Sequence, residues 1–121
     1  MKNIRAPAVA GLFYPANRDE LVQLINTELS QVTLRAEHHP QAIIVPHAGY
    51  IYSAAIAASV FKCLQAFRTT IKRVLLMGPA HRVAFNGLAL SSADFFHTPL
   101  GDIKIDTDGQ QQLLNIPGVQ V

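Results

Sequence analysis

Two segments of this sequence share one pattern, a short apolar run that ends in a loop containing histidine. Residues 42–45 (AIIV) are followed by His47, and residues 73–77 (RVLLM) are followed by His81. Between the two, residues 52–67 carry apolar side chains at helical spacing. The order strand, helix, strand predicts a βαβ unit with parallel strands and a right-handed crossover. The chain is therefore expected to adopt an α/β fold.

This pattern predicts a metal site. Parallel strands joined in this way end at the same edge of a sheet, where ligands usually bind, so His47 and His81 are expected side by side in one cleft. Imidazole is the commonest protein ligand for zinc, iron and copper. For His47 alone, a hydrogen bond within a turn would be the better explanation. The presence of both histidines in one cleft favours their role as two metal ligands.

Four motifs, taken in their order and spacing, resemble the Memo family. They are residues 7–15 (PAVAGLFYP), 46–50 (PHAGY), 78–81 (GPAH) and 91–102 (SSADFFHTPLGD). Two positions depart from the family pattern. Ala54 stands where a glycine commonly follows the Tyr-x-Tyr-Ser stretch, and Ala80 stands where the family often has serine. Neither is a proposed ligand.

The resemblance implies a fold and a metal. The family is similar to the class III extradiol dioxygenases, so we expect a three-layer α/β/α arrangement with a partly parallel sheet. Residues 1–121 are expected to form a single domain, the amino-terminal part of a longer Memo-like domain. His47 and His81 would hold Fe(II), with zinc or copper as alternatives. The family completes its site with a cysteine that is expected beyond Val121. Cys63 is not that residue, because it falls on the apolar face of a predicted helix, where a free cysteine packs as a small hydrophobe.

Tyrosines beside the motifs are candidates for binding substrate. Tyr50 follows the His47 loop directly, and Tyr14 lies in the first motif. A phenol near a metal can orient a substrate or a bound water, and the alternative for both is packing with a satisfied hydroxyl. His97 is expected in a loop, and the adjacent His38 and His39 in a solvated connection, so none of the three is predicted to be a ligand.

Three functions fit these residues, and the sequence does not choose among them. The first is an extradiol-type dioxygenase acting with O2 on a small oxygenated, aromatic substrate, with this chain alone inactive. The second is a non-catalytic binding or signalling module that uses the same cleft, because animal members of the family are tied to cell motility signalling. The third is a partner of a radical-SAM protein in modification chemistry, because microbial relatives tend to be encoded beside such proteins.

Composition bears on partners and location. The net charge is +2, only 15% of residues are charged and no block of Lys or Arg stands out, so no nucleic-acid interface is expected. No stretch approaches the ~18 apolar residues of a membrane span, and the first twelve residues lack the apolar run of a signal peptide. We expect a cytoplasmic protein without membrane contact. Self-association is expected where a sheet edge or apolar helix faces lie open.

The remaining elements follow from local signals. Asn17, with Glu20 three residues later, predicts the start of a helix whose apolar stripe includes Leu21 and Leu29. Further elements are expected as strands over residues 88–90 and 102–106, a short helix over 108–114, and the approach to another strand over 116–121.

Overall fold

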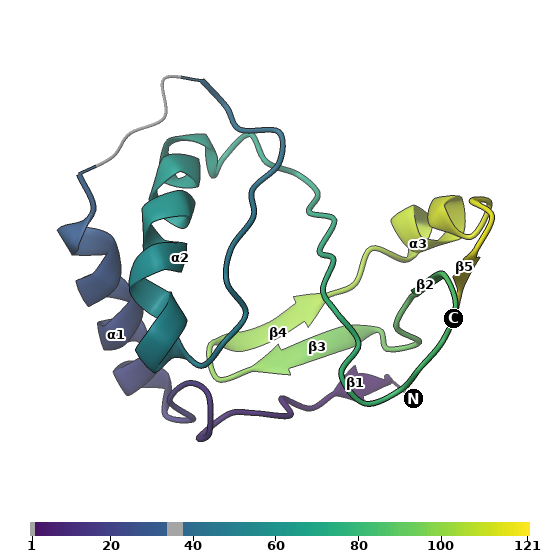
Figure 1. The fold of residues 1–121 in the computed structure, drawn as a ribbon, viewed down its shortest axis with the longest axis horizontal. Coiled ribbons are helices and arrows are strands. Elements are labelled where there is room, and N and C mark those ends of the chain that lie inside the picture. Colours follow the sequence, from purple (N-terminus) through teal and green to yellow (C-terminus); the bar gives the residue numbers. More distant parts are fainter. Residues whose placement is uncertain (1, 34–37) are drawn as a thin grey trace. The chain divides into compact units, whose positions relative to one another are not determined.

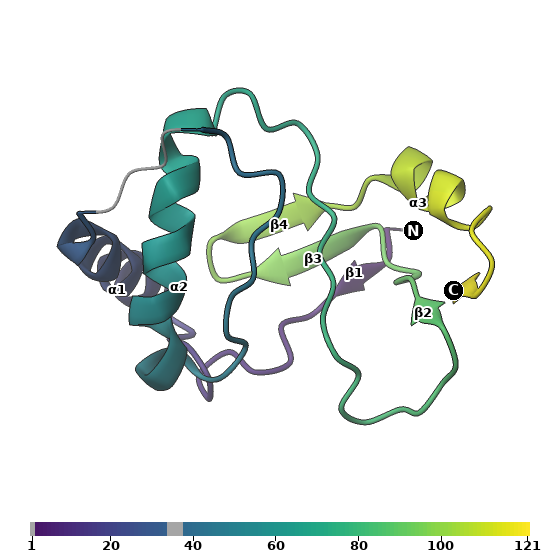
Figure 2. The ribbon, with the colours of Figure 1, turned by 45° about the horizontal axis from the view of Figure 1, so that its top comes forward.

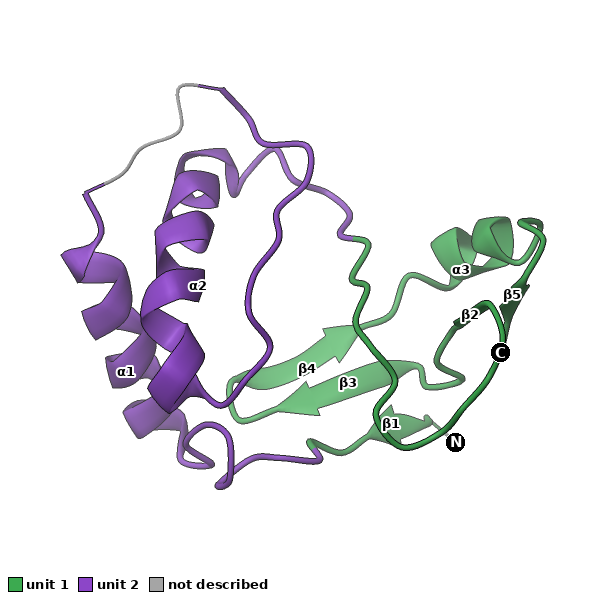
Figure 3. Cartoon of the chain, viewed as in Figure 1, with its two compact units in different colours: residues 1–7, 75–121 green, residues 8–74 purple. Residues whose placement is uncertain are grey.

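The computed structural model describes residues 2–33 and 38–121. Along this part of the chain the order of elements is β1, α1, α2, the 3₁₀ helix η1, β2, β3, β4, α3 and β5 (Figures 1 and 2). The chain divides into two compact units (Figure 3). Unit 2 is Ala8–Val74, and unit 1 joins the residues before Ala8 to Leu75–Val121. That both units belong to one domain stays a prediction.

Unit 2 is built on two helices that lie side by side, α1 (Arg18–Gln31) and α2 (Tyr50–Leu64), with η1 (Gln65–Phe67) following α2 (Figures 1 and 2). Asn17 caps α1, because its side-chain oxygen accepts hydrogen bonds from the backbone N–H groups of residues 19 and 20, at 2.8 and 3.1 Å. Such a cap satisfies donors that the first helical turn cannot pair internally. The predicted start of this helix is therefore confirmed.

Unit 1 contains two small sheets and a short helix. In the first sheet, β3 (Phe95–Thr98) lies between β1 (Ile4–Arg5), its parallel neighbour, and β4 (Gly101–Lys104), its antiparallel neighbour. In the second, β2 (Leu88–Ala89) and β5 (Val119–Gln120) pair in parallel. Helix α3 (Thr107–Leu113) is capped by Asp106, whose carboxylate accepts a hydrogen bond from the Gly109 N–H at 3.0 Å. The helices and the partly parallel sheets confirm an α/β fold.

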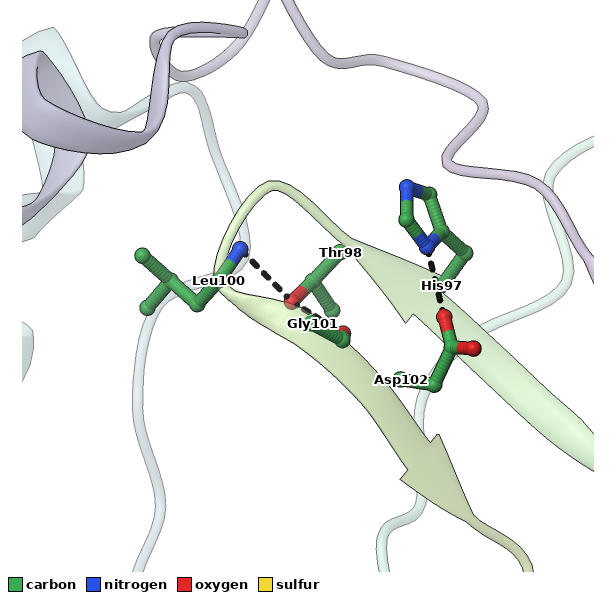
Figure 4. A network of polar contacts seen from close by, with 5 residues as sticks. All are labelled: His97, Thr98, Leu100, Gly101 and Asp102. Atoms are coloured by element: carbon green, nitrogen blue, oxygen red, sulfur yellow. Dashed lines mark hydrogen bonds and ion pairs between the residues drawn. The ribbon is translucent and has the colours of Figure 1, made fainter.

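His97 lies on a strand, so its predicted place in a loop is wrong. It faces Asp102 across the β3–β4 hairpin, and its Nδ1 is 2.6 Å from Asp102 Oδ1 (Figure 4). The turn of the hairpin is held by Thr98, whose hydroxyl donates to the Gly101 carbonyl at 2.8 Å and accepts from the Leu100 N–H at 3.2 Å. The sequence concealed this strand because residues 95–98 (FFHT) do not alternate apolar and polar side chains.

The two apolar runs at residues 42–45 and 73–77 are not strands, so the predicted pair of parallel neighbours is wrong here. Neither run has regular secondary structure, although Ile44 is 93% exposed between two half-buried neighbours, as in a strand. A strand exists only where a neighbouring strand accepts and donates its hydrogen bonds, and neither run has such a neighbour in residues 2–33 and 38–121. The shared sheet edge predicted for His47 and His81 is wrong with it, and their position in one cleft stays a prediction.

One helical segment in the described part of the chain, Tyr50–Phe67, is long and apolar enough to cross a membrane. It has 18 residues and a mean hydropathy of 1.2. A helix of a protein core can have the same length and composition, so this property alone does not identify a membrane span. The segment corrects the expectation that no stretch of the chain approaches the length of a membrane span. The cytoplasmic location stays a prediction.

Candidate functional site

Unit 2 contains an apolar cavity of about 550 Å³. Its walls come from α1, from α2, from the turn at residues 9–14 and from the loop at residues 45–50 that leads into α2. The polar or ionisable side chains on the walls are those of Tyr14, Glu28, His47, Tyr50 and Ser53, and the other lining residues are apolar. Cavities of this size and character hold small molecules in many proteins.

The loop that carries His47 is fixed at the start of α2. Ser53 is 4% exposed, and its hydroxyl lies 2.9 Å from the Ala48 carbonyl and 3.2 Å from the Gly49 carbonyl, to which it donates. The backbone N–H of Tyr50 donates to the Phe13 carbonyl at 2.7 Å. These contacts join the loop to the helix behind it and to the turn beside it.

The turn at residues 9–14 places Tyr14 against Tyr50. Gly11 has a φ of +80°, which favours glycine, and its N–H donates to the Tyr14 carbonyl at 2.8 Å. The N–H of Phe13 donates to the Val9 carbonyl at 2.9 Å. The centroids of the two tyrosine rings are 5.5 Å apart and the rings are tilted by 46°, a favourable arrangement for an aromatic pair.

Tyr50 is held in its neutral form over a wider pH range than an ordinary tyrosine. Burial raises its pKa, because a buried phenolate loses solvation, and the neighbouring Tyr14 raises it further by charge repulsion. The Tyr50 hydroxyl is therefore a hydrogen-bond donor near neutral pH. It can donate to an oxygen atom of a molecule in the cavity.

Three of the four predicted site residues, His47, Tyr14 and Tyr50, line this one cavity. His47 is also exposed to solvent. His81 belongs to unit 1, in an exposed segment that precedes β2. The structure thus brings the predicted substrate-binding residues to the first histidine within a single unit.

The donor set for a metal is incomplete in the described part of the chain. Nowhere in residues 2–33 and 38–121 do three His, Cys, Asp or Glu side chains gather closely enough to hold a metal ion. Among the described residues that line the cavity, His47 and Glu28 are the side chains of these types. Cys63 is half-buried on α2, and its thiol contacts the Ser59 carbonyl at 3.6 Å, which fits a structural cysteine. The described residues of unit 2 therefore contain no group of three such side chains.

The other histidines with described contacts have local roles. The ring of His39 packs on Phe67, with centroids 4.8 Å apart. The interaction of His97 with Asp102 joins two neighbouring strands.

The sequence interpretation did not assign most of the residues that line the cavity, among them Phe13, Glu28 and Phe61. Helical spacing could have identified Glu28, which follows Leu24 by four residues and Ile25 by three, on the same face of α1. Phe13 could have been inferred from its position beside Tyr14. Phe61 lies one turn after Ala57 on α2, so helical spacing predicts that both lie on the same face of this helix. The spacing does not predict that this face lines a cavity.

Comparison with known proteins gives one consistent family. The family model described as "Memo-like protein" matches residues 5–120. A MEMO1 family protein of Aquifex aeolicus is 37% identical over 114 residues, which are 94% of this chain and 41% of that protein. The memo-1 homologue of Caenorhabditis elegans is 35% identical, over 93% of this chain and 31% of its own length, and mouse MEMO1 is 38% identical, over 84% and 33%. The chain therefore spans well under half the length of these relatives.

Proposed function

Because this chain belongs to the Memo family, we propose that it is a metal-binding protein in which His47 and His81 are two of the ligands. Two neutral imidazoles together with one anionic ligand suit Fe(II) with open coordination positions, and zinc and copper are alternatives. The position of His47 beside a cavity supports this proposal. The third ligand is proposed to be a cysteine from sequence outside these 121 residues.

The observation that carries the proposal is the shared cavity of His47, Tyr14 and Tyr50. Its volume of about 550 Å³ and its apolar walls suit a small aromatic molecule. The tilted rings of Tyr14 and Tyr50 offer an aromatic surface on which such a ring can pack. The neutral hydroxyl of Tyr50 can donate a hydrogen bond to an oxygen substituent of the molecule.

The proposed reaction is an oxidation of the extradiol type, and a small oxygenated aromatic compound is the proposed substrate. Bound Fe(II) would supply the redox chemistry with O2. The residues of this chain would hold and orient the substrate: the apolar walls exclude water from its ring, and Tyr50 fixes one of its oxygens. With two of the three ligands that such sites typically use, the isolated chain is expected to bind metal weakly and to be inactive.

The first prediction concerns the two histidines. The chain is loaded with Fe(II) without oxygen, and bound iron per chain is measured by elemental analysis. His47→Ala and His81→Ala should each reduce bound iron at least tenfold, because a single imidazole cannot retain the ion. His97→Ala is the matched control, since His97 is an exposed histidine that does not line the cavity, and it should bind as the native chain does.

Equal iron binding by the native chain, His47→Ala and His81→Ala would contradict the metal proposal. Catalysis is tested separately, by following O2 uptake with catechols when the loaded chain is combined with the remaining polypeptide of the Aquifex aeolicus relative. Catechol binding without O2 uptake would instead indicate a binding module that uses the same cavity.

A further inference from the structure

A carboxylate interrupts the apolar face of α1 in the helical unit. Leu24 and Ile25 lie on that face, and Glu28 follows them at the next position of the same helical spacing. Glu28 is half-buried, whereas the two residues before it are exposed. A carboxylate in such a place loses part of its solvation, which a leucine would not. Packing of the helix alone therefore does not account for Glu28.

Glu28 supplies the negative charge of the cavity. It is the acidic side chain among the described lining residues, and no lysine or arginine is among them. The described residues form an ion pair between His97 and Asp102, in unit 1, and none of their ion pairs includes Glu28. A carboxylate that is partly removed from water attracts a cation more strongly than a fully solvated one does. The cavity is therefore suited to a positively charged group.

The aromatic rings of the same cavity also favour a cation. Phe13, Tyr14, Tyr50 and Phe61 contribute to its walls. The face of an aromatic ring carries partial negative charge and attracts an ammonium group within about 6 Å of the ring centre. The apolar walls suit an aromatic ring of the ligand itself. Together, the carboxylate and the rings favour an aromatic molecule that carries a positively charged amine.

The Tyr50 hydroxyl provides a second polar contact. Glu28 lies in α1 and Tyr50 begins α2, so the two groups reach the cavity from different elements. The hydroxyl can donate a hydrogen bond, and an oxygen atom on the ring of the ligand can accept it. A molecule with a ring oxygen at one end and an ammonium group at the other can therefore contact both.

We propose that the cavity of unit 2 binds a phenolic alkylamine, with its ammonium group paired with the Glu28 carboxylate and its ring against the aromatic walls. This inference rests on the proposed use of the cavity for a small oxygenated aromatic molecule, and it adds the charge of that molecule. It does not require the metal, since Glu28 and the aromatic residues all belong to unit 2. Glu28 also excludes aromatic carboxylates, because like charges in an apolar site repel each other.

Three compounds of nearly the same shape test the charge. Tyramine carries an amine that is protonated at neutral pH, as the amine of a lysine side chain is. A methyl group replaces this ammonium group in 4-propylphenol, and a carboxylate replaces it in 4-hydroxyphenylpropanoate. Their dissociation constants for the metal-free chain are measured at neutral pH by NMR titration. Tyramine should bind at least tenfold more tightly than the carboxylate compound.

A pair of variants isolates the contribution of Glu28. Glu28→Gln should weaken tyramine binding at least tenfold and change 4-propylphenol binding less than twofold, because it removes the charge and keeps the shape of the side chain. Glu20→Gln is the matched control, since Glu20 lies in the first turn of the same helix and does not line the cavity. It should bind all three compounds as the native chain does. Circular dichroism checks that the helices persist in both variants.

Equal affinity of the native chain and Glu28→Gln for tyramine would overturn the proposal, as would tighter binding of the carboxylate compound. If 4-propylphenol binds and tyramine does not depend on Glu28, the inference about charge fails and the proposed aromatic ligand stands. If none of the three compounds binds, both fail. The proposed metal ligands are tested independently of these outcomes by the iron measurements above.

Discussion

Tyr50 combines three roles in one residue of the helical unit. It begins α2, its N–H anchors the neighbouring turn, and its ring forms one wall of the cavity. Because the backbone contact does not use the hydroxyl, replacement by phenylalanine leaves that anchor intact. The effect of the hydroxyl can therefore be separated from the effect of the ring.

The second prediction is that Tyr50 ionises at higher pH than an ordinary tyrosine. Burial and the neighbouring Tyr14 raise the pKa of Tyr50 in the folded state, so its contribution to stability is fully present below about pH 10 and is lost as pH rises through the folded pKa. In a phenolate absorbance titration, Tyr50→Phe should remove a tyrosine transition that lies above the ordinary range. Tyr52→Phe, at a tyrosine that is 79% exposed, should leave that transition in place. Loss of the same transition in both variants would contradict the assignment.

At the scale of elements, the pairing of β2 with β5 depends on two backbones that approach closely. The N–H of Leu88 donates to the Gly118 carbonyl at 2.8 Å, and the N–H of Leu90 donates to the Gln120 carbonyl at 2.7 Å. Gly87 precedes this pair with a φ of +85°, and a Cβ there would overlap the Gly118 carbonyl oxygen. Only glycine fits both conditions.

The third prediction is that Gly87→Ala separates β2 from β5. The cost should be about 1–3 kcal/mol, since the backbone must leave its conformation to remove the overlap. Hydrogen exchange at the amides of Leu88 and Leu90 should accelerate by at least tenfold. Gly78→Ala is the control, because a Cβ at Gly78 meets nothing within 4 Å. Unchanged exchange at Leu88 in Gly87→Ala would show that the strand pair does not depend on this approach.

At the scale of the whole molecule, the sequence predicted elements that depend on local chemistry and failed where a distant partner decides. Helix α1 was predictable because the Asn17 cap and the apolar spacing lie within the helix itself. The runs at residues 42–45 and 73–77 have the composition of strands, but a strand needs a partner, and none lies in the described residues. Strand β3 was missed because residues 95–98 do not alternate apolar and polar side chains. It forms by pairing with β4 in a hairpin and with β1, some 90 residues away along the chain.

The candidate site was predictable in part. The family resemblance pointed to His47, Tyr14 and Tyr50, and the structure places all three at one cavity. The cavity itself was not predictable, because it depends on how α1, α2 and the turn at residues 9–14 pack together. The role of His81 as a second metal ligand stays a prediction.

The most direct test of the account counts the imidazoles bound to one metal ion. The chain is loaded with less than one equivalent of Cu(II), and electron spin echo modulation reports the number of coordinated histidine rings. The account predicts two rings in the native chain, one ring in His47→Ala and in His81→Ala, and two in His97→Ala. A single ring in the native chain, or two rings that persist in His81→Ala, would contradict the claim that His47 and His81 bind the same ion.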